Sequence, residues 1–144
     1  MPIAQSILDR KGGNVATIDH QATALQAAKL MNERHIGAVV VTKGDVVIGI
    51  FTERDILNRI VAMGRPPDAT TVASVMTSPM MCCRRDTPLS ECRAVMTNKR
   101  IRHLPVVEDG KLYGMISAGD ILASEVVGQQ QTIEYLEEYL YRRS

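Results

Sequence analysis

The sequence contains one seven-residue pattern twice, as GIFTERD at residues 49–55 and as GMISAGD at residues 114–120. Each copy has Gly, two apolar residues, a hydroxyl residue, two variable residues and Asp in the same order. The second copy begins 65 residues after the first, in a chain of 144 residues. A pattern that recurs within so short a chain predicts an internal duplication.

The duplication extends well beyond this pattern. With a shift of 65, residues 31–57 align with residues 96–122 without a gap, and most apolar positions stay apolar. Upstream, the first half has three additional residues, which the loop KGGN at residues 11–14 accommodates. We therefore divide the chain into a first motif (1–64), a linker with a Pro-Pro pair (65–71), a second motif (72–128) and a C-terminal segment (129–144).

Both halves predict the element order β-α-β-β-α. The predicted strands cover residues 15–18, 38–41 and 46–51 in the first half, and 80–83, 103–107 and 111–116 in the second. Apolar residues at i, i+3, i+4 and i+7 predict the first helix of each half, and the Gly-containing turns TKGD and EDG predict hairpins. The strands are continuously apolar, which favours burial on both faces. The sequence thus predicts an α+β fold in which two repeats pack with pseudo-two-fold symmetry, followed by a C-terminal helix.

The C-terminal segment at residues 129–144 has an amphipathic helical pattern, with apolar side chains at Ile133, Leu136 and Leu140. It has no counterpart within the first half. The pattern is compatible with a helix that packs on its own domain and equally with a helix that contributes to a dimer contact.

Composition excludes several classes of partner. Aromatic residues make up 3% of the chain, so few rings are available to stack on single-stranded nucleic acid. A net charge of +1 provides no field that would attract DNA or an anionic membrane. No apolar run reaches the roughly 18 residues of a membrane helix. We therefore expect neither a nucleic-acid nor a membrane partner.

The cysteines and the N-terminus predict a cytoplasmic protein. Three Cys, an odd number, do not form a disulfide framework, which indicates a reducing compartment. The first residues lack the basic segment and apolar run of a signal peptide.

The repeated pattern has two compatible interpretations. It is a capping box, in which Thr52 or Ser117 caps a helix and Asp55 or Asp120 reaches back to the backbone. It is also a candidate ligand site, because Gly within a strand often marks close approach of a ligand or another backbone. A helix that begins directly after a buried strand also presents free N–H groups to an anion, and an Asp carboxylate can accept hydrogen bonds from two ribose hydroxyls.

The duplicated β-α-β-β-α order, the pattern in each copy and RHLPVV at residues 102–107 resemble a tandem pair of CBS domains, the Bateman module. The resemblance covers residues 3–127, and the chain is most similar to stand-alone bacterial proteins with two CBS domains. It implies a non-enzymatic regulatory or sensor module without a catalytic cofactor. The expected ligand is an adenine nucleotide (AMP, ADP, ATP or NAD) in the cleft between the motifs. The family also implies a homodimer and a separate protein partner that responds to the ligand.

The resemblance assigns roles to individual residues. Asp55 and Asp120 would bind ribose hydroxyls, and Thr52 and Ser117 would face phosphates. The other binding residues it implies are Thr17, Ile36, Gly37 and Ala38 around the first adenine, and Cys82, Ile101, Arg102, His103 and Pro105 around the second. Arg54 can pair with a phosphate, whereas the second copy has Gly119 at that position. We therefore expect one strong site and one weaker or different site.

Other functions have less support in the sequence. His20, His35 and His103 do not have the spacing of metal ligands such as H-E-x-x-H, so we expect no metal site and no enzyme. A thiol switch at the three cysteines is one alternative. The strongest alternative is a protein interaction or dimerisation module in which the pockets are vestigial.

Overall fold

The computed structural model describes residues 2–126, so the predicted C-terminal helix at 129–144 lies outside the described residues. The elements are α1 (Ala4–Lys11), β1 (Thr17–Asp19), α2 (Ala24–Arg34), β2 (Ala38–Lys43), β3 (Val46–Thr52), α3 (Glu53–Asp55), the π-helix η1 (Ile56–Val61), the 3-10 helix η2 (Pro67–Ala69), α4 (Val72–Val75), α5 (Leu89–Lys99), β4 (His103–Glu108), β5 (Lys111–Ser117) and α6 (Ala118–Val126). Among these residues, no helix combines the length and the apolar character that crossing a membrane requires.

The first half has the predicted order. β1 pairs with β2 in parallel, and β2 pairs with β3 in an antiparallel hairpin. The hairpin turn contains Gly44 at a φ of 62°, a conformation that Gly adopts without steric cost. Helix α2 begins with a capping box, because Thr23 Oγ1 accepts from the Gln26 N–H at 3.1 Å and the Gln26 side chain accepts from the Thr23 N–H at 2.9 Å.

The second half repeats the hairpin but not the first strand. β4 and β5 form a two-stranded antiparallel sheet. The strand predicted at residues 80–83 was wrong, because only Cys83 pairs there, as a single parallel bridge with Val106. Residues 80–82 do not pair because Pro105, which has no N–H, stands where the first half has Val40, whose N–H donates to the Ala16 carbonyl at 3.0 Å. Downstream of the bridge, the Arg85 N–H donates to the Glu108 side chain at 2.9 Å.

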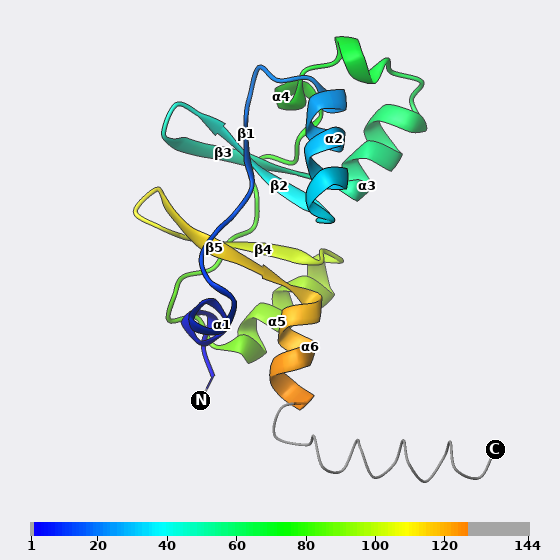
Figure 1. Ribbon diagram of the computed structural model, residues 1–144. Helices are drawn as coiled ribbons and strands as arrows, with labels where there is room; N and C mark the ends of the chain where they lie inside the picture. Colours follow the sequence, from blue (N-terminus) through cyan, green and yellow to red (C-terminus); the bar gives the residue numbers. More distant parts are fainter. Residues whose placement is uncertain (1, 127–144) are drawn as a thin grey trace, which may run out of the picture.

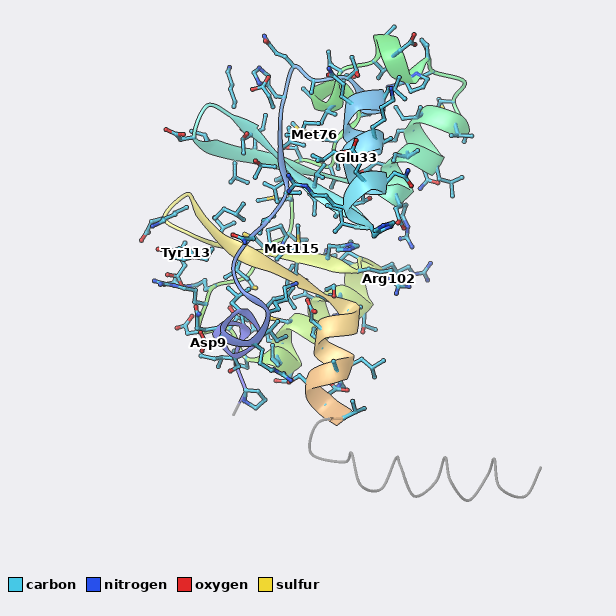
Figure 2. All side chains as sticks on the ribbon, viewed as in Figure 1. Asp9, Glu33, Met76, Arg102, Tyr113 and Met115 are labelled. Carbon is cyan, nitrogen blue, oxygen red and sulfur yellow. The ribbon has the colours of Figure 1, made fainter. Side chains whose placement is uncertain are left out.

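The two hairpins meet in the middle of the molecule, and the helices lie on its two outer sides (Figure 1). Helices α2, α3 and α4 lie with the first sheet, whereas α1, α5 and α6 lie with the second sheet. β3 contacts β5 across this boundary, and Figure 2 shows Met115 of β5 between the two halves. The predicted sheet-to-sheet packing is therefore confirmed.

The two halves exchange their leading helices. α1, which begins the first motif, packs in the second core, where its buried residues Ala4, Ile7 and Leu8 join Leu104 and other aliphatic side chains. α4, which begins the second motif, packs in the first core through Val72 and Val75. The packing units therefore do not follow the boundaries 1–64 and 72–128 that the repeat suggests. Neither helix was predicted from the sequence.

The two repeated glycines show how closely the exchanged segments pack against the strands. A Cβ at Gly114 would lie 2.4 Å from Leu8 Cδ2, and a Cβ at Gly49 would lie 2.7 Å from Met76 Sδ and 2.9 Å from the Thr77 carbonyl oxygen. In both motifs the glycine thus admits the leading segment of the other motif. Of the two reasons proposed for a strand glycine, close approach of another segment is the one that the structure shows.

We predict that Leu8→Ala lowers the free energy of unfolding by about 2–5 kcal/mol, because it opens a cavity in the second core. Leu8 is 5% exposed. Urea unfolding followed by circular dichroism measures the change. The matched control is Leu122→Ala, because Leu122 is also helical but 62% exposed, and we expect it to change stability by less than about 1 kcal/mol. Equal effects of the two changes would contradict the exchange of helices.

Candidate functional site

A cavity of about 370 Å³ lies between the two motifs beside Asp55. Several residues that the sequence predicted line it: Gly37, Thr52, Arg54, Asp55, Ile101, Arg102 and His103. The sequence did not identify the remaining lining residues, Ile50, Glu53, Leu57, Thr77, Pro79, Met81 and Arg100. Of these, Thr77, Pro79 and Met81 belong to the segment that follows α4, which only the fold brings to Asp55.

The cavity is therefore composite. Asp55 and Thr52 come from the end of β3 and the start of α3, whereas residues 101–103 come from the start of β4 in the other motif. The backbone bond from the Glu53 N–H to the Gly37 carbonyl, at 3.1 Å, holds the start of α3 next to the start of β2. The same bond recurs in the second half between the Ala118 N–H and the Arg102 carbonyl, at 2.9 Å. The duplication thus builds the same junction in both motifs, and we call each of these junctions a corner.

Other predicted residues lie outside this cavity. Thr17 lines a separate cavity of about 390 Å³ beside the two hairpin turns. Pro105 is fully buried in β4, and its carbonyl accepts from the Cys83 N–H at 2.9 Å. Ile36 packs against the first core and Ala38 is buried. None of these residues lines the Asp55 cavity, and their predicted contacts with adenine stay predictions.

Asp55 is buried, and its carboxylate is already hydrogen-bonded. Oδ2 accepts from the Thr52 N–H at 3.0 Å and from Thr52 Oγ1 at 3.3 Å, so the capping box is present. Oδ1 accepts from Thr77 Oγ1 at 3.0 Å, and the Arg59 guanidinium is 3.8 Å away. Both carboxylate oxygens of Asp55 are therefore already hydrogen-bonded within the chain.

Asp120 has a different set of partners. Its Oδ2 accepts from the Ser117 N–H at 2.8 Å and from Lys11 Nζ at 2.7 Å. The Asp120 side chain is 24% exposed, compared with 7% for Asp55. Burial acts to raise the pKa of Asp120, but the bonds from Lys11 and Ser117 outweigh it, and the pKa lies below its ordinary value. No sequence pattern indicated that Lys11 would reach Asp120, because α1 was not predicted.

His103 lies at the boundary between the two corners. A Cβ at Gly37 would be 3.1 Å from His103 Cε1 and 3.2 Å from Glu53 Oε1, so these two side chains would have to shift slightly to admit a larger residue. Burial lowers the pKa of His103 below its ordinary value, which keeps the ring neutral at pH 7. The charges of Lys11 and Asp120 also act on this ring, in opposite directions.

Cationic side chains gather on one side of the Asp55 cavity. Arg54 Nη1 donates to the Arg100 carbonyl at 2.6 Å, which joins the two motifs directly. Arg100 and Arg102 line the same cavity, and Figure 2 shows Arg102 at the side of the molecule, near the level at which the halves meet. The guanidinium of Arg54 retains further N–H groups that an anion can use.

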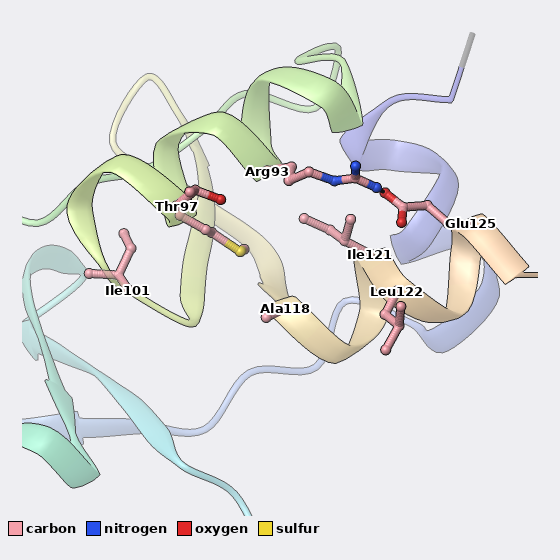
Figure 3. Close-up of a pocket in the computed structure, with 8 residues that line it drawn as sticks. Arg93, Thr97, Ile101, Ala118, Ile121, Leu122 and Glu125 are labelled. Carbon is pink, nitrogen blue, oxygen red and sulfur yellow. Dashed lines mark ion pairs between the residues drawn. The ribbon is translucent and has the colours of Figure 1, made fainter.

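A third hollow lies between α5 and α6 (Figure 3). This groove of about 260 Å³ is lined by Met96, Ile121 and Leu122, and an ion pair between Arg93 and Glu125 crosses it. It contains neither Asp55 nor Asp120. We therefore do not regard it as the predicted site.

The cysteines lie outside the cavity. Cys82 is exposed, whereas its neighbour Cys83 is buried. Cys92 is also buried, and its contact with Cys83, together with burial, raises the pKa of the Cys83 thiol. Within residues 2–126, no three His, Cys, Asp or Glu side chains are grouped so that they could hold a metal ion.

Comparisons with known proteins agree with this architecture. The family model of the CBS domain matches residues 6–62 and 72–126. The mitochondrial CBS domain-containing protein CBSX3 of Arabidopsis thaliana is 33% identical over 123 residues, which are 82% of this chain and 60% of the relative. The chain thus spans about 60% of the length of that relative.

Solved structures show the same fold. A putative signal-transduction protein with CBS domains from Burkholderia ambifaria superposes with a TM-score of 0.84 at 38% identity, over 90% of this chain and 96% of that one. A hexameric CBS-CP12 protein from bloom-forming cyanobacteria superposes with a TM-score of 0.77 at 29% identity, over 98% of this chain and 86% of that one.

We predict that Asp120 contributes to stability at neutral pH and not in acid. A carboxylate whose pKa is lowered by folding stabilises the native state above its unfolded pKa, which is 3.8 for an ordinary Asp, and this stability is lost as the pH falls through the folded value. The difference in unfolding free energy between the wild type and Asp120→Asn should therefore be largest near pH 7 and shrink below about pH 4.

Urea unfolding at pH 7 and pH 3 measures this difference. Asp9→Asn, at an exposed position of α1, is the control, and its effect on the unfolding free energy should depend less on pH. A difference that grows in acid for Asp120→Asn would contradict the assignment.

Proposed function

Because the chain belongs to the CBS-domain family, as a tandem pair of CBS domains, we propose that it is a regulatory module that binds an adenine nucleotide between its two motifs. The observation that carries this proposal is the composite cavity, which joins Thr52, Arg54 and Asp55 of one motif to residues 101–103 of the other. Its volume of about 370 Å³ lies within the usual range for sites that bind small molecules.

The chemistry of the cavity wall suits the parts of a nucleotide. Apolar side chains of Ile50, Met81 and Ile101 offer a surface for a flat base. The Asp55 carboxylate accepts ribose hydroxyls in place of the Thr77 hydroxyl. Arg54 supplies N–H groups for a phosphate, to which a guanidinium can bind through two parallel hydrogen bonds. In this proposal the ligand is bound and released without reaction.

Signalling follows from the composite wall. A ligand that contacts both motifs favours the arrangement in which both sets of contacts are made, and it shifts the population towards that arrangement by its differential affinity. A separate protein then responds to the shift. The three free cysteines are compatible with the reducing cytoplasm in which we propose that this module acts.

An alternative function is a protein interaction module with vestigial pockets. The observation in its favour is that Thr52 and Thr77 already satisfy the Asp55 carboxylate without any ligand. Thermal unfolding with AMP, ADP, ATP and NAD distinguishes the two functions, because a ligand at a hundred times its dissociation constant stabilises the native state by about 2.7 kcal/mol. Unchanged melting with all four ligands would favour the interaction module.

We predict that Asp55→Asn weakens nucleotide binding roughly ten- to a hundredfold, because hydrogen bonds to a charged carboxylate contribute about 1.5–3 kcal/mol. Isothermal titration calorimetry measures the change, and circular dichroism checks that the variant is folded. The control is Asp68→Asn in the exposed helix η2, which should bind as the wild type does. Binding that is equal in both variants would refute the role of Asp55.

We also propose that the chain forms a homodimer, and we predict that Val61→Glu weakens it. Val61 and Leu57 are exposed on one face of η1, at positions i and i+4, and Met63 follows them. Similarity to a hexameric CBS protein supports assembly. Sedimentation velocity should show a dimer for the wild type and a monomer for Val61→Glu, with no effect from Val46→Glu in the exposed start of β3. A monomeric wild type would contradict this part of the proposal.

A further inference from the structure

The second motif lacks a cation where the first motif has Arg54, because Gly119 stands at the equivalent position. The structure nevertheless places a cation beside the Asp of the second motif. Lys11 Nζ lies 2.7 Å from Asp120 Oδ2. This lysine is the last residue of α1, so it belongs to the first motif in sequence and to the second in space.

The exchange of leading segments fixes Lys11 in this place. The Ala4 N–H donates to the Thr87 carbonyl at 2.8 Å, and Leu8 packs against Gly114, so α1 is fastened along the second half. The equivalent leading segment of the second motif places Thr77 against Asp55. Each motif thus supplies one side chain to the Asp of the other, but one is a neutral hydroxyl and the other is an ammonium.

The bond from Lys11 leaves one oxygen of the Asp120 carboxylate unused. Among the hydrogen bonds of the described residues, Asp120 uses only Oδ2, so Oδ1 can accept a ribose hydroxyl while Lys11 stays bound. An ammonium has three donors, and two of them remain for a phosphate. The Lys11 side chain is 37% exposed, so it can also turn towards a ligand.

Resting on the proposed function, we propose that Lys11 determines ligand specificity at the second site, by selecting adenosine ligands that carry a phosphate. Lys11, in α1, contacts the phosphate at the second site, as Arg54, in α3, does at the first site. A nucleoside without phosphate would gain nothing from this lysine. The loop KGGN at residues 11–14, which accommodates the three additional residues of the first motif, begins at this lysine.

A purely structural role for Lys11 makes a different prediction. If the lysine only fastens α1 to α6, its loss disturbs Asp120 and weakens nucleoside and nucleotide binding alike. The ratio of the affinities for AMP and adenosine separates the two roles, because only a contact with phosphate changes that ratio.

The experiment measures the binding of AMP and adenosine to the full chain by calorimetry. An Asp55→Asn background weakens the first site, so that the second site dominates the titration. In this background, Lys11→Met should weaken the binding of AMP about tenfold, because AMP loses a charge-assisted hydrogen bond to its phosphate. Adenosine has no phosphate, so its binding should weaken less than about twofold. Lys11→Arg should restore AMP binding.

Two controls limit the interpretation. Lys99→Met, at the exposed end of α5, should change neither affinity. In an Asp120→Asn background, where the first site dominates, Lys11→Met should also have no effect. Circular dichroism checks the fold of each variant, and Lys11→Gln provides a polar replacement if Lys11→Met does not fold.

The possible failures are distinct. An AMP to adenosine ratio that Lys11→Met leaves unchanged overturns the role of Lys11, whether both affinities fall or neither does, and the proposed function stands. A wild-type chain that binds neither AMP nor any other adenine nucleotide overturns the proposed function and this inference together, and the wild type alone reveals it.

Discussion

Leu8 packs against Gly114 so closely that no side chain fits at the glycine, and the segment at Met76 and Thr77 meets Gly49 in the same way. Because of these two contacts, each core is completed by a helix from the other motif. The sheets consequently face each other at a fixed distance, and the start of α3 lies across the boundary from the start of β4. The composite cavity exists because of this arrangement.

The same contacts bring a side chain to each repeated Asp. At Asp55 this is a partly buried threonine hydroxyl, whereas at Asp120 it is a partly exposed lysine. The duplication thus produces two corners that share the same backbone hydrogen bond but place different side chains beside the Asp. The capping box and the ligand site are not competing explanations here, because the carboxylate that caps the helix also lines the cavity.

Local features of the sequence predicted the elements that local physics determines. The hairpins follow from turns in which Gly44 and Gly110 have positive φ, and α2 follows from its apolar spacing and its cap at Thr23. α1 and α4 were missed because they are short and their apolar faces are buried only by the other motif. The strand at 80–83 failed because its neighbour β4 has Pro105, without an N–H, at the position where Val40 donates to Ala16 in the first half.

The site was predictable in its repeated part and not in its exchanged part. Thr52, Asp55 and residues 101–103 follow from the repeated pattern and from the family resemblance, and the structure brings them together. Thr77 and Lys11 come from segments far away in sequence, and neither carries a motif. Their roles depend on which half each leading segment joins, a property of the whole fold.

The crossing of the leading helices also bears on how such a chain can be divided. A cut in the segment at 65–71 would leave the first fragment without Val72 and Val75 and the second without α1, so each fragment would expose part of its interior. Neither fragment is a self-sufficient building block, although the repeat suggests two. The two pieces would become well ordered only on meeting, as the parts of a complementation pair do.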